Sequence, residues 1–267
     1  MALDLPMFDL SGKKALVTGS SNGIGKAAAL MLARAGADVA VTYHKDKDAG
    51  AAVVSEIKKF GHRAFLFQCD IADAKAAERN AAEAAEALSG LDIAVNAALR
   101  DHLSGHGVPS LDPKACEEFD FISGSALNTT FYLCRAAALQ MYKSGGGKIV
   151  NLGSISGFLV QRELGQSASF NAYAASKAGV IQLTKMLAAE WREYNIRVNC
   201  VSPGYTDTRS LDGLKTASEA YNQVLNRIPI ARVGSSDEVA SAILFMCAPA
   251  SDDCTGSHMI VDGGYHI

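Results

Sequence analysis

The sequence predicts a single doubly wound α/β domain, in which a parallel sheet of seven strands is flanked by helices. Three observations predict it: apolar, β-rich runs recur along the chain, alanine-rich segments of helical length lie between them, and no linker interrupts the alternation. A length of 267 residues with 49% hydrophobic residues suits one large domain with a well-buried core. We therefore expect residues 1–267 to form one domain.

Seven short runs of apolar and β-branched residues are the expected strands. They cover residues 14–18, 38–42, 64–69, 92–96, 148–152, 197–201 and 259–261. Alanine-rich helices are expected at residues 24–35, 74–88, 173–194 and 236–246. Residues 99–114, rich in Gly and Pro, and residues 158–171, a long connection, fit neither pattern. Long loops near strand ends are where substrate sites are built.

A glycine-rich turn joins the first strand to the first helix. Backbone N–H groups at a helix N-terminus attract anions, and glycines let the backbone approach them closely. The turn thus predicts a pyrophosphate site. Its residues are Gly19, Ser21, Asn22, Gly23, Ile24 and Gly25. The spacing is GxxxGxG, which differs from the GxGxxG dinucleotide fingerprint, so an ordinary strand-to-helix turn is the alternative.

The end of the second strand favours NADP(H) over NAD(H). In NAD-binding proteins an acid at this position accepts from the free ribose 2′-hydroxyl. Here the strand leads into His44 and Lys45, and the first acid is Asp46. A basic pair suits a 2′-phosphate better. The alternative is that both side chains are simply solvated surface groups.

Tyr173 and Lys177 lie one helical turn apart, and Ser154 ends an apolar strand upstream of them. Residues four apart share a helix face. Because an ammonium favours the phenolate, we expect Lys177 to lower the pKa of Tyr173 and make it a general acid or base. From residues 173–177 alone, an amphipathic helix that carries a Tyr and a Lys by chance is as good an interpretation as a catalytic pair.

Taken together, the motifs resemble those of the short-chain dehydrogenase/reductase family, which has a Rossmann-type fold. The resemblance covers nearly the whole chain. Its motifs are residues 18–25, Asp70, residues 96–98, Ser154, Tyr173 with Lys177, residues 199–204 and residues 262–264. Jointly these motifs are far more specific than any one of them alone.

The resemblance implies a role for each matched residue. Tyr173 would donate a proton to a carbonyl oxygen, Ser154 would hydrogen-bond the same oxygen, and Lys177 would lower the phenol pKa and hold the nicotinamide ribose. The remaining residues would bind the cofactor. Asp70 and Ile71 would meet the adenine, Asn96 the adenosine ribose side, and Pro203, Gly204, Thr206 and Thr208 the nicotinamide amide.

Two positions depart from the family pattern. Leu99 stands where the family usually has a glycine beside the cofactor, and its bulk narrows that place. Ala126 stands where the family has a catalytic asparagine, and Asn128 comes two residues too late. The missing amide puts the water-mediated proton relay to Lys177 in doubt, but not hydride transfer. Ser125 and Asn128 are the polar residues near Ala126 in the sequence that would supply partners for a water in place of the missing amide.

Within the family, the long 154–173 connection and residues 188–191 and 202–205 look like those of fungal-type mannitol, sorbose and xylulose reductases. This resemblance implies a ketose/polyol pair or a related carbonyl compound as substrate. A reductase that tailors a larger secondary metabolite is the alternative among enzymes. A protein that binds NADP to sense or scaffold, with eroded catalysis, is the alternative outside enzymes. The family also implies a homotetramer.

Composition narrows the partners further. A net charge of -3 without a basic block gives no reason to expect nucleic acid or a membrane surface. Six scattered cysteines without CxxC spacing fit reduced thiols, and residues 1–12 do not read as a secretory signal, so a cytoplasmic protein is expected. His102 and His106 could share a metal, but Gly105 and Gly107 indicate a loop, so no metal is expected.

Overall fold

The computed structural model describes residues 6–99, 107–161 and 167–267. Its centre is a parallel sheet of seven strands in the order β3-β2-β1-β4-β5-β6-β7. The strands are β1 Lys14–Thr18, β2 Asp38–Tyr43, β3 Ala64–Gln68, β4 Ile93–Asn96, β5 Gly147–Leu152, β6 Ile196–Pro203 and β7 His258–Val261. All seven expected strands are present, and the predicted fold class is confirmed.

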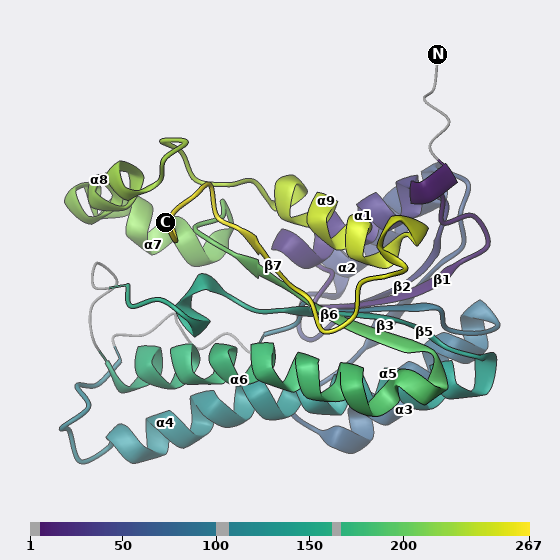
Figure 1. Cartoon of the computed structure of the whole chain (residues 1–267), viewed down its shortest axis with the longest axis horizontal. Helices are drawn as coiled ribbons and strands as arrows, with labels where there is room; N and C mark the ends of the chain where they lie inside the picture. Colours follow the sequence, from purple (N-terminus) through teal and green to yellow (C-terminus); the bar gives the residue numbers. More distant parts are fainter. Residues whose placement is uncertain (1–5, 100–106, 162–166) are drawn as a thin grey trace.

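Helices cover both faces of the sheet (Figure 1). One face carries α1 Gly23–Arg34, α2 Lys47–Lys59 and α9 Ser236–Cys247, and the other carries α3 Ala74–Leu88, α4 Ala115–Ser123, α5 Thr129–Ser144 and α6 Ala168–Glu190. Neighbouring strand residues point to opposite faces. Val17 therefore packs in the core beside α1, and Leu16 in the core beside α3 and α5. This two-sided burial is why the strands are continuously apolar.

A third, smaller apolar cluster lies beyond the carboxyl ends of β6 and β7. It involves α7 Asp212–Thr216 and α8 Ser218–Arg227, which follow β6 in the chain. Tyr205 and Tyr265 meet edge to face there, with ring centroids 5.3 Å apart. The carboxyl end of the sheet is thus covered partly by elements that come after β6.

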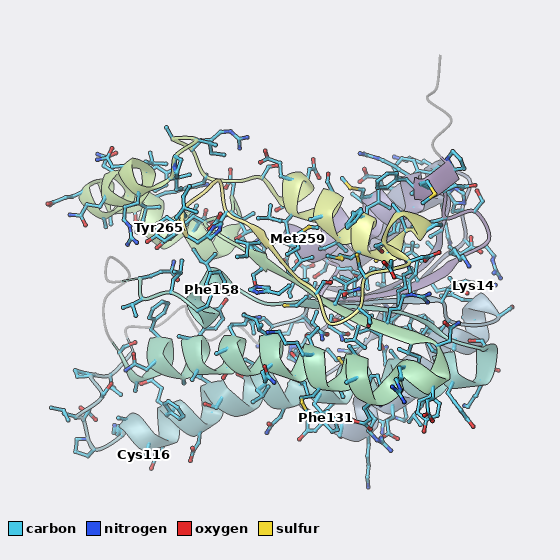
Figure 2. The ribbon with its side chains drawn as sticks, in the orientation of Figure 1. Lys14, Cys116, Phe131, Phe158, Met259 and Tyr265 are labelled. Carbon is cyan, nitrogen blue, oxygen red and sulfur yellow. The ribbon has the colours of Figure 1, made fainter. Side chains whose placement is uncertain are left out.

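The strand order reverses beside β1, which pairs with β2 on one side and β4 on the other. Ligands of open α/β sheets bind outside the carboxyl ends of the strands at such a reversal. Figure 2 places Lys14, at the amino end of β1, at one side of the molecule and Phe158 and Tyr265 toward the other. The candidate site residues follow strand ends on the Phe158 side.

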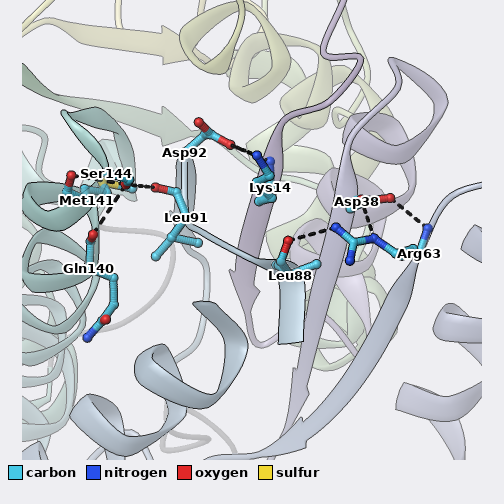
Figure 3. A network of polar contacts seen from close by, with 9 residues as sticks. All are labelled: Lys14, Asp38, Arg63, Leu88, Leu91, Asp92, Gln140, Met141 and Ser144. Atoms are coloured by element: carbon cyan, nitrogen blue, oxygen red, sulfur yellow. Dashed lines mark hydrogen bonds and ion pairs between the residues drawn. The ribbon is translucent and has the colours of Figure 1, made fainter. Parts of the chain in front are cut away.

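Polar contacts fix the opposite, amino edge of the sheet (Figure 3). The Lys14 backbone N–H donates to the Asp92 carboxylate at 2.8 Å. Arg63 joins the Asp38 carboxylate and the Leu88 carbonyl, each at 2.8 Å. These contacts join β1 to the start of β4 and β2 to the start of β3, on the side of the molecule away from the candidate site.

The largest boundary difference is at α6, which begins at Ala168, five residues before the expected start. The Ser167 hydroxyl caps it by accepting from the Phe170 backbone N–H at 3.1 Å. The helix ends at Glu190 and continues as a 3₁₀ turn, Trp191–Tyr194. A π-helical turn, Gly124–Asn128, also joins α4 to α5 without a break.

Candidate active site

The glycine-rich turn after β1 is packed so closely that side chains would not fit at two of its positions. A Cβ on Gly19, whose φ is +65°, would lie 2.6 Å from the Ala98 Cα. A Cβ on Gly25 would lie 2.3 Å from the Gly19 carbonyl oxygen. Gly23 has more space around it, because a Cβ there would meet only side-chain atoms of Thr208, the nearest being its methyl group at 3.6 Å. The turn is therefore tight on its inner side and more open at Gly23.

Two hydroxyls that the sequence analysis did not single out tie this turn to β2. The Ser20 hydroxyl donates to the Val17 carbonyl at 2.7 Å and accepts from the Thr42 backbone N–H at 2.9 Å. The Gly19 backbone N–H donates to the Thr42 hydroxyl at 3.0 Å. The turn is thus held in shape by its own chain, before any ligand binds.

The N-terminus of α1 has no side-chain cap. Asn22 occupies the cap position without a capping hydrogen bond, whereas side chains cap α2, α3, α6 and α9. Uncapped N–H groups at a helix start can bind an anion. Ser21 is half-buried and Asn22 exposed beside them. This end of α1 and the tight turn together fit a pyrophosphate.

Two basic residue types follow the end of β2. Tyr43 ends the strand beside α2, because a Cβ on Gly50 would lie 3.4 Å from the Tyr43 Cβ. His44 and Lys45 follow and are exposed. The Asp46 carboxylate accepts from the Ala49 backbone N–H at 2.9 Å and so caps α2. The nearest acid in sequence is therefore occupied in capping.

The two residues expected at the adenine follow β3. Asp70 is exposed, and its carboxylate accepts from the Ala72 backbone N–H at 3.0 Å. Ile71 is buried in the core beside α3. The structure thus gives this pair one polar member at the surface and one apolar member in the interior.

Asn96 takes part in an interior network. Its amide nitrogen donates to the Asn151 carbonyl oxygen at 2.9 Å, and the Asn151 amide nitrogen donates to the Thr184 hydroxyl at 3.0 Å. The alternation along β4 sends the Asn96 side chain toward the α5 and α6 side of the sheet. Its amide therefore links β4, β5 and α6, and its place along the adenosine ribose stays a prediction.

The segment after β6 reaches the glycine-rich turn. Gly204 lies against Asp262, because a Cβ there would be 2.5 Å from the Asp262 Cβ. Thr206 is buried and donates to the Gly204 carbonyl at 3.1 Å. Thr208 lies over Gly23, as its methyl distance shows. The glycine-rich turn and the segment after Pro203 are both predicted to bind the cofactor. They thus meet in space through Gly23 and Thr208, which are 185 residues apart in the sequence.

Ser154, Tyr173 and Lys177 come together from β5 and α6. Ser154 follows β5 and caps a 3₁₀ turn, Ile155–Gly157. A hydrogen bond with Ser154 lowers the pKa of Tyr173, but burial raises it more, so the net shift is upward. The Lys177 Nζ lies 5.7 Å from the centroid of the Tyr173 ring. The expected shared helix face is confirmed.

The expectation that Lys177 lowers the Tyr173 pKa is wrong in this structure. The pKa of Tyr173 is raised, with desolvation as the largest cause and Ser154 as the opposing one. Lys177 is itself buried, and its Nζ donates to the Leu152 carbonyl at 2.7 Å. Burial lowers the pKa of Lys177 to about 8. The spacing gave the shared face correctly, but it could not give the desolvation of both groups.

Ala126 lies inside the π turn and is 2% exposed. Its carbonyl accepts from the Thr129 hydroxyl at 3.2 Å and the Thr130 hydroxyl at 2.8 Å. The Ser125 hydroxyl donates to the Ile122 carbonyl at 2.9 Å, and Asn128 is exposed. These bonds keep Ser125 within its own helix turn.

Leu99, the other residue that departs from the family pattern, is 38% exposed, and the neighbouring Ala98 is the residue that packs against Gly19.

Sequence reasoning missed two residues that extend the Ser154 site. The Ser154 hydroxyl donates to the Ser156 hydroxyl at 3.1 Å, and the Ser156 hydroxyl donates to the Gln161 amide oxygen. Ser156 is 7% and Gln161 3% exposed. Their position in the 154–173 connection was the only available signal, because distance along the chain does not show which loop residues turn inward.

The described residues contain no group of three or more His, Cys, Asp or Glu side chains that could hold a metal. His102 and His106 lie outside the described residues. All six cysteines are free of disulfides. Within the described part of the chain, no helix has the length and apolar character needed to cross a membrane.

Comparison with known proteins gives the same family throughout. A family model described as enoyl-(acyl carrier protein) reductase matches residues 19–266. The 3-oxoacyl-(acyl-carrier-protein) reductase FabG of Staphylococcus aureus is 36% identical over 96% of this chain and 98% of its own. Cyclohexanol dehydrogenase of Rhodococcus is 36% identical over 96% of each chain. Sorbose reductase of Schizosaccharomyces pombe is 35% identical over 97% of this chain and 98% of its own.

Solved structures agree with these sequences. A putative short-chain alcohol dehydrogenase from Sinorhizobium meliloti has a TM-score of 0.88 and 37% identity, covering 98% of this chain and 99% of that one. A 7α-hydroxysteroid dehydrogenase complexed with NADH has a TM-score of 0.86 and 33% identity, covering 97% and 96%. A short-chain dehydrogenase from Burkholderia cenocepacia in complex with NADP has a TM-score of 0.84 and 36% identity, covering 97% and 99%.

Proposed function

Because the chain belongs to the short-chain dehydrogenase/reductase family, whose members among its relatives are oxidoreductases, we propose that it transfers a hydride between NADP(H) and a ketone or secondary alcohol. The observation that carries the proposal is the meeting of Ser154, Tyr173 and Lys177 at the carboxyl end of β5. A phenol, a hydroxyl and a buried amine are the groups that proton transfer to a carbonyl oxygen requires.

The chain's residues fit a nicotinamide dinucleotide. The tight turn at Gly19 and Gly25, with uncapped N–H groups at the start of α1, suits the pyrophosphate. Thr208 and Gly23 lie together, so the segment after β6 would cover the same molecule. Bound there, the nicotinamide would supply or accept the hydride. Lys177 would hold its ribose hydroxyls, in place of the Leu152 carbonyl that Lys177 contacts here.

The chain's own part in reduction is to move one proton. Tyr173 would donate its phenolic proton to the carbonyl oxygen as hydride reaches the carbonyl carbon, which together give the alcohol. Ser154 would hydrogen-bond the same oxygen and so stabilise its developing charge. The raised pKa of Tyr173 keeps the phenol protonated at neutral pH, which is the form that reduction uses.

The preference for NADP(H) rests on His44 and Lys45. Both are exposed immediately after β2, and the neighbouring acid, Asp46, caps α2. A charge-assisted contact to a 2′-phosphate contributes about 1.5 to 3 kcal/mol, which corresponds to tenfold or more. One solved relative holds NADP and another NADH, so either cofactor occurs among relatives.

For the substrate we favour a ketose/polyol pair or a related carbonyl compound. The similarity to a sorbose reductase supports this class, and the similarity to cyclohexanol dehydrogenase supports a simple cyclic ketone or alcohol. A tailoring ketoreductase of a secondary metabolite is the alternative.

Six cysteines without disulfides support a reducing compartment such as the cytoplasm.

Steady-state kinetics with a panel of ketoses, diketones and cyclic ketones tests the proposal. NADPH oxidation, followed by absorbance, should exceed NADH oxidation at least tenfold in kcat/KM, and Lys45→Ala should shrink the ratio. Lys58→Ala, on the exposed last turn of α2, is the matched control. Equal efficiency with NADH would overturn the cofactor assignment. NADPH binding without reduction of any carbonyl would favour the non-catalytic sensor instead.

A further inference from the structure

We propose that Gln161 forms a substrate subsite, in which its amide N–H donates to an oxygen on a carbon next to the reacting carbonyl. The matching substrates are α-hydroxyketones, ketoses and α-diketones. The inference rests on the proposed ketone reduction at Ser154 and Tyr173 and adds to it the feature that would select among ketones.

The hydrogen bonds of the Ser154 turn fix how Gln161 is oriented. Ser154 donates to Ser156, and Ser156 donates to the amide oxygen of Gln161. The oxygen of the Gln161 amide is the end that faces the Ser156 hydroxyl, which donates to it. The amide nitrogen is therefore the end that remains for another group.

That nitrogen has no hydrogen-bond partner among the described residues, although Gln161 is only 3% exposed. The fully buried side-chain atoms without a partner in the described structure are the two amide atoms of Asn80. Buried polar groups are nearly always paired, and an unpaired donor at the edge of a site is relieved by a ligand acceptor.

The reach of this donor sets the chemistry of the ligand. Two hydrogen bonds separate the Gln161 amide oxygen from the Ser154 hydroxyl, so the two atoms are at most about 6 Å apart. Ser154 would hold the carbonyl oxygen of the substrate. The Gln161 amide nitrogen is bonded to the same carbon as the amide oxygen, so it lies within about 8 Å of the Ser154 hydroxyl. Two hydrogen bonds and the two oxygens on adjacent carbons of one substrate can bridge this span. The amide is neutral, so it suits a hydroxyl or carbonyl oxygen.

A second role for Gln161 must be separated from this one, because it could simply hold Ser156 and thereby Ser154. Gln161→Glu retains an oxygen that accepts from Ser156 but loses the N–H donor. Gln161→Met has a similar length and loses both. A subsite predicts that both variants lose selectivity, whereas mere support of Ser154 predicts that only Gln161→Met is impaired, and equally for all ketones.

The test compares 2-hydroxycyclohexanone with cyclohexanone, which differ by one adjacent hydroxyl on a rigid ring. With NADPH, the parent should show at least tenfold higher kcat/KM for the hydroxyketone. That ratio should fall at least tenfold in Gln161→Glu and Gln161→Met. Gln182→Met, at an exposed glutamine on α6, is the matched control and should keep the parental ratio.

A parent without preference for the hydroxyketone, or variants that keep the parental ratio, would overturn the subsite. Failure of the proposed function has a different signature, namely a parent that reduces neither ketone. In that case calorimetric titration of the two ketones into the protein still decides the inference. Tighter binding of 2-hydroxycyclohexanone to the parent, lost in Gln161→Met, supports the subsite, and equal binding of both ketones contradicts it.

Discussion

Tyr173 and Lys177 show how burial and hydrogen bonding oppose each other at a single site. Burial raises the pKa of the phenol and lowers that of the amine to about 8. Both shifts favour the neutral forms, and Ser154 offsets only part of the shift at Tyr173. The phenol therefore stays protonated at neutral pH, whereas the Lys177 amine, with a pKa of about 8, is still mostly charged at pH 7 and becomes neutral above about pH 8.

Tyr173→Phe should retain NADPH binding and lose turnover. The ring, which stacks with Phe170 at a centroid distance of 6.3 Å, would still pack, but the proton donor would be gone. General acid catalysis contributes about 10² to 10⁴ in rate. Turnover measured beside fluorescence titration of NADPH checks both halves. Turnover within a few fold of the parent would mean that another group is the acid.

Lys177→Met should stabilise the cofactor-free protein while it impairs turnover. The pKa of Lys177 falls from 10.5 in the unfolded chain to about 8 in the folded one. Between these values the unfolded chain binds more protons, so the parent's free energy of unfolding rises with pH across this window. Below about pH 8 the full cost of burying the charge is present. We expect the variant to be more stable by about 1 to 3 kcal/mol at pH 7.

Urea unfolding of the parent and Lys177→Met at several pH values tests this expectation. The difference in free energy of unfolding should shrink as pH rises from 8 to 10.5, because the parent no longer buries a charge. Lys185→Met, at an exposed lysine on the same helix, should show no such pH-dependent difference. A constant difference across the window would show that Lys177 keeps an ordinary pKa.

Among the elements, the strands were the most predictable, and the connections the least. β1 and α3 have the expected bounds, because continuous burial gives apolar strands and alanine gives helices. The early start of α6 depends on the Ser167 cap, which the sequence pattern does not distinguish within a long connection of mixed apolar and polar residues. The inward turn of Gln161 and the interior amide of Asn96 depend on contacts with residues distant in the sequence.

α3 contains a local conflict between polarity and burial. Asn80 is 3% exposed, and neither its amide oxygen nor its amide nitrogen has a partner. Asn80→Leu, close in size, should raise the free energy of unfolding by about 1 to 2 kcal/mol, because an unpaired buried polar group is removed. The midpoint temperature of thermal unfolding should rise by about 2 to 4 °C for each kcal/mol gained in the free energy of unfolding. Asn222→Leu, exposed on α8, is the control, and an unchanged or lower midpoint for Asn80→Leu would contradict the account.

At the scale of the whole molecule, an exposed apolar stripe on α5 points to association. Phe131, Leu139 and Tyr142 are 40%, 40% and 64% exposed. Their spacing places them on one face of the helix. Tyr194, after α6, meets Tyr142 edge to face at 5.2 Å and extends the stripe to the neighbouring helix. Large exposed apolar patches mark interaction surfaces, and the family resemblance implies a homotetramer.

We therefore expect a particle of about four 28.0 kDa chains in light scattering. Phe131→Glu combined with Leu139→Glu should reduce the mass, because a second copy would have to bury two charges against the stripe. Leu111→Glu, at a residue that is 98% exposed and outside α5, should leave the mass unchanged. A circular dichroism spectrum like the parent's would show that the double variant is folded. A parent mass of 28.0 kDa, or a double variant with the parental mass, would show that the stripe does not form an interface between chains.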